Sequence, residues 1–172
     1  MGHSQTGALN DTTEILPQLL RCCILMGYYP DWDIEVTWVP VDYVSRTVRA
    51  LSEKPEAFGH SVHLFNARPV HWLSLMEYFS EAGYALQRVS YDRWRQEVKK
   101  YTAPGMPERE FFAGILQAVT GFHYLFHTRP KFDNSELFDL FDGSDFRCPA
   151  IQSSMIEAYI RHWKKTGFLP TP

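Results

Sequence analysis

Hydrophobic residues recur at helical spacing along most of the chain, and at strand spacing over a few short stretches. Apolar positions three and four apart predict a first helix over about 15–24. Thr12 or Thr13 is placed to cap the start of this helix, and Gly27 is placed to end it. The chain therefore begins with a polar segment followed by one amphipathic helix.

Two further helices are predicted in the first half of the chain. Asp42 is expected to be the N-cap of one of them, in which Val44, Val48 and Leu51 form a single apolar face. The other is predicted over about 71–82, where apolar residues again repeat three, four and seven positions apart. Each helix is expected to bury its apolar face against the rest of the protein.

The last third of the chain is also predicted to be helical. Residues 108–127 are apolar on most faces, so this helix is expected either to pack inside a core or to line an apolar cavity. Ser154 and Glu157 indicate a capping box at the start of a final helix. Gly167 is placed to end that helix, with Phe168 folding back on it. Its buried stripe is predicted to be Ile156, Tyr159, Ile160 and Trp163.

Short stretches with alternating polarity predict strands. These are 34–38, 61–66 and an extended segment at 84–91, whereas 28–33 is expected to be a loop. Asp92 is placed to cap the helix that follows. The predicted fold class is α/β, mostly helical with a few short strands, which are too few for a doubly wound sheet of their own.

Composition narrows the class of protein. The chain has 172 residues, 45% of them hydrophobic, and a net charge of −3, as expected for one soluble globular domain. Its basic residues form no run longer than a pair, which argues against nucleic-acid binding, and no apolar run is long enough to span a membrane. Three cysteines, two of them adjacent, argue against a disulfide scaffold and favour a cytoplasmic location.

Several catalytic motifs are absent from the sequence. No two glycines lie two or three positions apart, so the chain has no dinucleotide-binding fingerprint. None of the nine tyrosines is followed by Lys four positions later, which is the acid–base pair of short-chain reductases. His123 and His127 have the spacing of two metal ligands, but without a third ligand nearby they are interpreted as polar edges of a helix.

The stretch GHSQTGALN at residues 2–10 remains as the candidate site. Glycines allow a backbone to approach a ligand closely, and hydroxyl and amide groups supply directional hydrogen bonds. The residues alone leave two interpretations open, because such a segment is also typical of a polar turn that leads into the following helix.

A resemblance to a known family adds to this interpretation. The opening stretch is followed by LLRCCILMGYYPDWD, VTWVPVDYVSRTVRAL and SVHLFNARPVHWLSLMEYFSEAGYAL, and the chain closes with CPAIQSSMIEAYIRHWKKTGFLP. Together these stretches resemble the C-terminal part of the thioester reductase domains that end nonribosomal peptide synthetases, hybrid polyketide assembly lines, aminoadipate reductases and carboxylic acid reductases. The resemblance covers nearly the whole chain and is weakest over residues 103–130.

The resemblance implies an extended short-chain reductase. Its N-terminal Rossmann domain would hold NADPH and the catalytic residues, and a carrier protein would deliver the acyl chain as a phosphopantetheine thioester for release as an aldehyde or alcohol. In this chain it implies one substrate-binding domain, with an interdomain or active-site loop at 1–12, an α/β part at 13–102 and a helical part at 103–172.

Five residues of the opening stretch match the family's loop and are expected to face the cofactor or the thioester: Gly2, Ser4, Thr6, Gly7 and Asn10. The N-terminal half is expected to lie upstream of this sequence, so no catalytic residue, metal or bound cofactor is expected in this chain alone. Two alternatives stay open. One is a non-catalytic module that binds carrier proteins or acyl chains, and the other is a release domain that cyclises its product without redox chemistry.

Overall fold

The computed structural model describes residues 2–9, 13–128, 133, 135–141 and 146–172, with the backbone alone for 122–128. The helices are α1 (Ile15–Met26), α2 (Val41–Ser52), the 3-10 turn η1 (Pro55–Ala57), α3 (Trp72–Glu81), α4 (Tyr91–Tyr101), α5 (Arg109–Thr128), α6 (Ser135–Leu140) and α7 (Ser153–Thr166). The strands are β1 (Tyr28–Pro30), β2 (Glu35–Val36), β3 (Val70–His71) and β4 (Gln87–Val89). The predicted class, α/β and mostly helical with a few short strands, is confirmed.

The four strands form two separate two-stranded sheets. β1 pairs in parallel with β4, and β2 pairs antiparallel with β3. The prediction of a loop over 28–33 was wrong for 28–30, which form β1. The predicted strand at 61–66 was also wrong, because this stretch pairs with no strand among the described residues. A strand is defined by its partner, and alternation of polarity alone does not supply one.

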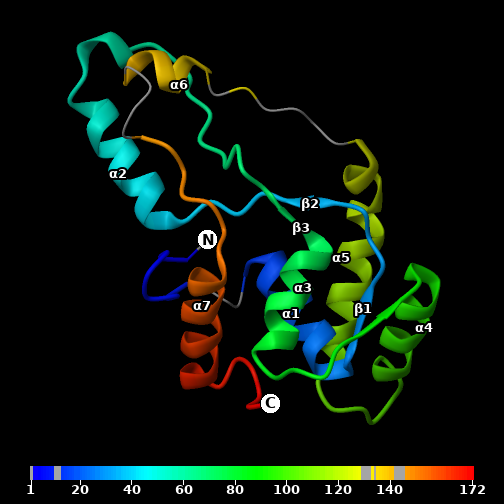
Figure 1. Ribbon diagram of the computed structural model, residues 1–172. Coiled ribbons are helices and arrows are strands. Elements are labelled where there is room, and N and C mark those ends of the chain that lie inside the picture. The colour runs from blue at the N-terminus through cyan, green and yellow to red at the C-terminus, as the bar shows by residue number, and fades with distance from the viewer. Residues whose placement is uncertain (1, 10–12, 129–132, 134, 142–145) are drawn as a thin grey trace.

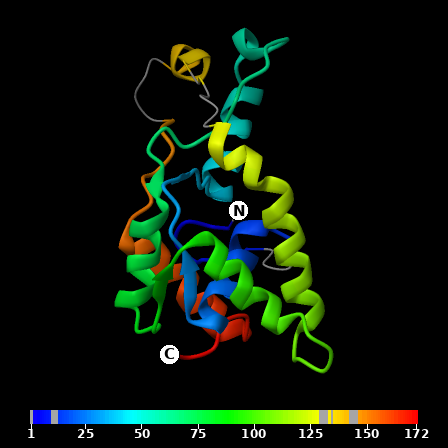
Figure 2. The ribbon, with the colours of Figure 1, turned by 90° about the vertical axis from the view of Figure 1, so that its right-hand side faces the viewer.

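The molecule has a helical body and a projecting end. In Figures 1 and 2, α2 and α6 lie at one end of the molecule and the C-terminus lies at the other, with the described N-terminal residues between them. Within the body, α5 packs against both α4 and α1, and α7 packs against α3. The opening stretch therefore lies where the projecting end meets the body.

Aromatic side chains fill the core. Four tryptophans have no exposed surface: Trp38, Trp72, Trp94 and Trp163. The ring of Trp163 stacks on Phe79 at 6.2 Å between centroids and lies 5.6 Å from Phe168, so the predicted return of Phe168 onto α7 is confirmed. The four residues of the predicted α7 stripe are all buried. Burial of one such aromatic side chain stabilises the fold by roughly 2–3 kcal/mol.

Helix α2 presents a different face from the predicted one. Its buried residues are Tyr43 and Thr47, whereas Val48 is 54% exposed and Val41 is 43% exposed. Val44, from the same predicted face, is half-buried. The apolar stripe along α2 is therefore only partly covered by the rest of the described chain.

The predicted N-caps were wrong, whereas the glycines predicted to end α1 and α7 were right. Helix α2 begins after Pro40, α4 after Ser90 and α7 after Gln152, so Asp42, Asp92 and the Ser154–Glu157 box are not N-caps. The N-cap of α1 is Glu14 rather than Thr13, and Thr12 lies outside the described residues. Gly27 and Gly167 both adopt the left-handed conformation that ends a helix, as predicted.

Helix α5 is buried on one side and exposed on the other over the residues whose side chains are described. Phe112, Ile115 and Val119 are buried, but Ala113 and Gln117 are exposed. The helix is therefore not buried on most sides over 109–121, although Phe111 and Ile115 line a pocket, as the cavity alternative predicted. The side chains of His123 and His127 lie outside the described part of the chain. No described helix is both long and apolar enough to cross a membrane.

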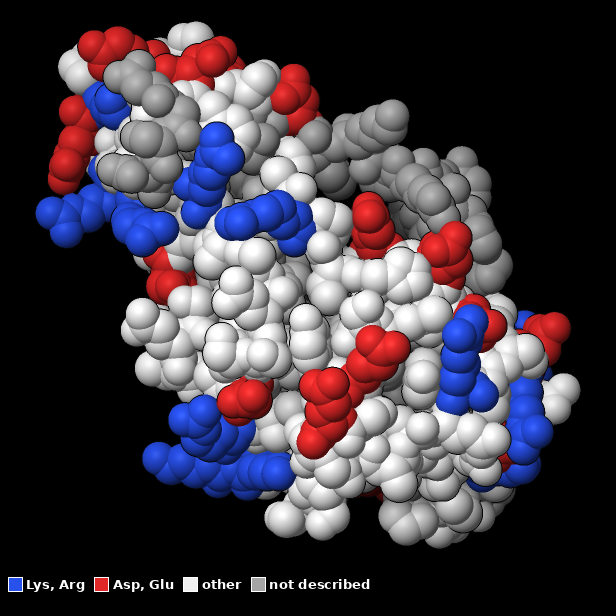
Figure 3. Space-filling model, viewed as in Figure 1, with Lys and Arg blue, Asp and Glu red and all other residues white. Residues whose placement is uncertain are grey.

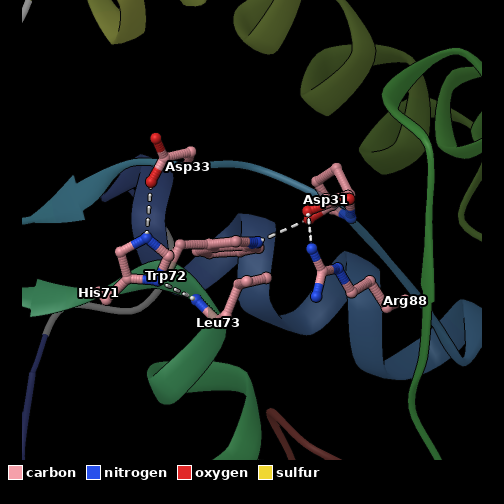
Figure 4. A network of polar contacts seen from close by, with 7 residues as sticks. Asp31, Asp33, His71, Trp72, Leu73 and Arg88 are labelled. Carbon is pink, nitrogen blue, oxygen red and sulfur yellow. Dashed lines mark hydrogen bonds and ion pairs between the residues drawn. The ribbon is translucent and has the colours of Figure 1, made fainter.

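A polar network joins the two small sheets to α3 (Figure 4). The indole N–H of Trp72 donates to the Pro30 carbonyl at 2.8 Å, and Arg88 pairs with Asp31 at 2.6 Å. Nδ1 of His71 accepts from the backbone N–H of Leu73 at 3.3 Å, and its Nε2 lies 3.0 Å from an Asp33 carboxylate oxygen. His71 thus caps α3, and these side chains serve the scaffold.

Candidate functional site

The opening loop, residues 2–9, is anchored between the start of α2 and the middle of α7. The carbonyl of Gly2 accepts two hydrogen bonds, one from the Tyr159 hydroxyl at 2.8 Å and one from the Val41 N–H at 3.0 Å. The loop folds on itself, because the His3 N–H donates to the Ala8 carbonyl at 2.9 Å. Its position is therefore fixed by two elements that lie far from it in the sequence.

Both glycines of this loop are packed against protein atoms. Gly7 has φ +70°, and a Cβ placed on it would lie 2.3 Å from the carbonyl oxygen of Ala158 in α7. A Cβ on Gly2 would lie 2.6 Å from the ring of Tyr159. These glycines thus allow the loop to pack closely against α7 of this protein. A cofactor-facing role for them stays a prediction.

Ser4 binds the side chain of Asp42 through two groups. The Ser4 N–H donates to Oδ1 at 2.8 Å, and the Ser4 hydroxyl donates to Oδ2 at 2.7 Å. Burial raises the pKa of Asp42, but the hydrogen bonds from Ser4 favour the carboxylate and hold the pKa below its usual value. Sequence reasoning identified Asp42 only as a helix cap, and no local pattern indicated its pairing with a residue 38 positions away.

The other candidates of the loop differ in what they offer a ligand. Thr6 is exposed, and its hydroxyl accepts from the Ala8 N–H at a long 3.4 Å. Gln5, which was not a candidate, is also exposed. Asn10 lies outside the described residues. Two of the five predicted residues are glycines and a third lies outside the described residues. Ser4 and Thr6 are therefore the predicted residues whose side chains can be described on this loop.

A pocket of about 510 Å³ adjoins this loop. Its polar lining comes from three parts of the chain: Ser4, Gln5, Arg68, Gln152, Ser154 and Arg161. The side chain of Asn66, which is 2% exposed, fixes the Arg68 segment because it donates to the carbonyls of Trp38 and Pro149 at 3.1 and 3.0 Å. Arg68 in turn donates to the carbonyl of Cys148 at 3.0 Å. One wall of the pocket thus carries an exposed arginine that a hydrogen bond holds in place.

A second pocket, of about 750 Å³, lies between α1, α5 and the end of α7. Arg21 forms part of its wall and is held in place by Glu108 at 2.6 Å and by the Phe168 carbonyl at 2.8 Å. The guanidinium also lies 4.6 Å from the centre of the Phe111 ring. Because its partners hold it on three sides, Arg21 supports the packing of α5 against α1.

Charge is unevenly distributed over the surface. Figure 3 shows Lys and Arg side chains gathered at the upper left, over the α2 and α6 end, and at the lower left, below α7. Lys164 and Lys165 lie in the last turn of α7, as predicted. No group of three His, Cys, Asp or Glu side chains suited to hold a metal ion occurs among the described residues.

Known proteins are similar to this chain both in sequence and in structure. No family model matches the chain. Glycine betaine reductase ATRR of Emericella nidulans is 29% identical over 99% of this chain, and the L-2-aminoadipate reductase large subunit of Penicillium chrysogenum is 26% identical over 100% of it. The chain spans only about 13% of the length of each of these relatives.

Solved structures agree with the sequence relatives. The terminal R domain from the myxalamid PKS-NRPS pathway matches 100% of this chain and 43% of its own, with 28% identity and a TM-score of 0.84. A thiolation-reductase di-domain from an archaeal nonribosomal peptide synthetase matches 98% of this chain with a TM-score of 0.75. Its identity of 17% shows the shared fold alone.

Proposed function

Because this chain belongs to the reductase domains of nonribosomal peptide and polyketide synthetases, we propose that it forms the C-terminal, substrate-binding part of an NADPH-dependent thioester reductase. The parent protein would release an acyl or peptidyl chain from its carrier protein as an aldehyde or an alcohol. The observation that carries this proposal is the match to the myxalamid terminal R domain, which extends over the whole chain at a TM-score of 0.84.

The residues of this chain do not fit NADPH as its main binding site. A diphosphate is usually held by glycines whose open sides face the ligand at the start of a helix. Here a Cβ on Gly2 or Gly7 would meet Tyr159 or Ala158, so both glycines pack against this protein itself. We therefore assign the cofactor to the other part of the parent protein and derive no step of the reaction through it.

Helix α2 supports the proposal of an N-terminal partner domain. Val41 and Val48 lie seven positions apart on one face and are 43% and 54% exposed. An exposed apolar helix face of this kind is what a second domain would cover.

The experiment compares this chain alone with a chimaera. In the chimaera, residues 1–172 replace the matching part of the myxalamid R domain, and NADPH consumption is followed with an acyl-pantetheine thioester as substrate. We expect thioester reduction by the chimaera and none by the chain alone. Robust NADPH oxidation by the chain alone, or a folded chimaera without activity, would contradict the proposal.

The same proteins separate the two alternatives. A non-catalytic module would bind an acyl-loaded carrier protein with equal affinity as the chain alone and in the chimaera, and would leave NADPH unconsumed in both. A cyclising release domain would free the product from the carrier at the same rate with and without NADPH. Mass analysis of the released product distinguishes an aldehyde or alcohol from a ring.

A further inference from the structure

We propose that the pocket beside the opening loop binds the phosphate group of the phosphopantetheine arm that presents the thioester. This inference rests on the proposed function and adds to it the site at which this chain holds its substrate carrier. It follows from three features of the pocket, namely its charge, the exposed start of α7 and the chemistry of its remaining walls.

The charge of the lining favours an anion. Arg68 and Arg161 come from separate elements, and no Asp or Glu is among the residues that line the pocket. Arg161 makes no ion pair within the part of the chain that the structure describes, and Arg68 uses only one of its guanidinium nitrogens, on the Cys148 carbonyl. A guanidinium donates paired hydrogen bonds to phosphate oxygens, so both side chains keep the donors that a phosphate needs.

The N-terminus of α7 opens into the same pocket. Its N-cap, Gln152, makes no side-chain capping bond, and the first turn contains no acidic residue. The backbone N–H groups of Ser153 and Ser154 have no partner among the described residues. A 14-residue helix thus places free amides and the positive end of its dipole beside the pocket that the two arginines also line. The predicted capping box would have neutralised this end, and it does not form.

The remaining walls suit the rest of the arm. Gln5, Gln152 and Ser154 can bond the two amides and the hydroxyl of a pantetheine chain. The apolar lining consists of Pro149, Ala150, Met155 and Ala158, which can contact its dimethyl group. No aromatic side chain is among the lining residues that could stack on a nucleotide base, so the pocket favours the arm over a dinucleotide. A volume of about 510 Å³ is typical of small-molecule sites.

The first test measures binding to the chain by calorimetry with four probes: 4′-phosphopantetheine, pantetheine, inorganic phosphate and NADPH. We expect phosphopantetheine to bind at least roughly tenfold more tightly than pantetheine, because even one hydrogen bond to a charged group is worth about that factor. The preference should shrink as salt is added. Inorganic phosphate should bind more weakly than phosphopantetheine, since it lacks the amide contacts.

Two variants and a control locate the site. Arg161→Gln should remove most of the preference for phosphopantetheine over pantetheine, whereas Arg93→Gln on the exposed face of α4 should keep it. Ser154→Asp should weaken phosphopantetheine binding but raise the melting temperature, because a carboxylate in the first turn stabilises the helix and repels the phosphate. Ser154→Asn, which has the same size without the charge, should weaken binding less. A variant that is more stable yet binds less cannot be explained by misfolding.

Three results would overturn the inference. These are equal binding of phosphopantetheine and pantetheine, a preference that survives Arg161→Gln, and tighter binding of NADPH or of bare phosphate than of phosphopantetheine. Failure here is distinct from failure of the proposed function. If the chimaera reduces acyl-pantetheine and acyl-phosphopantetheine with the same KM, the reductase assignment stands and the phosphate site is rejected. If the chimaera folds but is inactive, while the chain of residues 1–172 still prefers phosphopantetheine over pantetheine, the phosphate site stands and the reductase assignment is rejected.

Discussion

The hydroxyl of Tyr159 donates a 2.8 Å hydrogen bond to the carbonyl of Gly2, which joins the last helix to the first described residue across 157 positions. Around this bond, the opening loop, the start of α2 and the face of α7 that lines the smaller pocket are held in one arrangement. The conformation of the candidate site is thus set by contacts made at both ends of the chain.

Replacing Tyr159 by Phe should reduce the free energy of unfolding by about 1 kcal/mol, the usual contribution of one buried hydrogen bond. The loss should not exceed this, because the Gly2 carbonyl keeps its bond from Val41. Urea unfolding followed by circular dichroism measures the change. Tyr78→Phe is the control, because its half-buried hydroxyl makes no such bond. Equal effects of the two variants would show that the bond does not stabilise the loop.

The Ser4–Asp42 pair should make part of the stability depend on acid pH. Burial opposes ionisation of Asp42, but the bonds from Ser4 outweigh it and lower the pKa, so folding favours the carboxylate. This contribution is present above the unfolded value of about 3.9 and is lost as the pH falls through the lower folded value. Ser4→Ala should therefore cost about 1 kcal/mol near neutral pH and progressively less as the pH falls through the lowered pKa of Asp42.

The check for this pair is a series of urea titrations at several pH values, with NMR titration of the Asp42 carboxyl carbon. In Ser4→Ala the pKa of Asp42 should move up toward its ordinary range. Ser45→Ala, at an exposed position of the same helix, should change neither quantity. A constant stability difference at all pH values would mean that Ser4 acts by packing and not through the carboxylate.

Gly7 and Gly59 provide a matched test of why the loop requires glycine. Both have positive φ, +70° and +81°, but a Cβ at Gly59 would meet no atom within 4 Å, whereas one at Gly7 would meet the backbone of α7 at 2.3 Å. Gly59→Ala should cost about 1 kcal/mol from backbone strain alone. Gly7→Ala should cost about 2–4 kcal/mol, since α7 must also shift. Similar thermal unfolding of both variants would contradict this packing role.

Buried thiols should make the protein sensitive to alkaline pH. Burial raises the pKa of Cys148 from 9.0 to about 12, and burial likewise raises the pKa of Cys22 and Cys23. Above about pH 9 the unfolded chain releases thiol protons that the folded chain keeps, so stability falls as the pH rises toward 12. Urea midpoints at about pH 8 and pH 10 measure this fall. Cys148→Ser should show a smaller fall than the unmodified chain.

The exposed face of α2 should be needed for docking but not for folding. Val48→Lys should leave the melting temperature of the chain within about 1 °C, because the side chain is already 54% exposed. In the chimaera, the same change should lower the melting temperature and the activity, because it places a charge in the proposed interface. Gln96→Lys on α4 is the control and should have neither effect. An unaffected chimaera would exclude this face as the contact.

Long periodic patterns predicted the parts of the fold that depend on local geometry. The helix from Trp72 and the buried stripe ending at Trp163 were predicted because three- and four-residue spacing determines which side chains share a face. Gly27 and Gly167 were predicted because a left-handed residue after a helix almost requires glycine. These features need no knowledge of distant parts of the chain.

The missed features depend on distant partners. The strand at Tyr28–Pro30 forms only because Gln87–Val89 lies beside it in parallel, and the sequence gives no sign of that pairing. Three N-caps were missed because Pro40 and Gln152 make no side-chain capping bond and because Ser90, which does, lies two positions before the predicted Asp92. Within the candidate site, the loop was proposed from its glycines and hydroxyls together with the family resemblance, and its role stays a prediction.

What sequence reasoning could not supply for the site was its surroundings. The Asp42 partner of Ser4 and the arginines of the neighbouring pocket come from segments that meet the loop only in three dimensions. Arg161 in particular is one polar residue on an amphipathic helix, and nothing in its local spacing distinguishes it from a solvated side chain. Its proposed role depends on the free start of α7 and on Arg68, which lines the same pocket.

The enclosed tryptophans give the protein a built-in optical reporter. Trp32 lies 5.4 Å from Trp72 and 6.0 Å from Trp94 between ring centres, while Trp38 and Trp163 lie 6.5 Å apart in the region of α7. Light emission from the native chain should thus be shielded from dissolved quenchers. Loosening around Trp38 and Trp163 by the opening-loop variants should admit a quencher before the chain unfolds, without any attached dye.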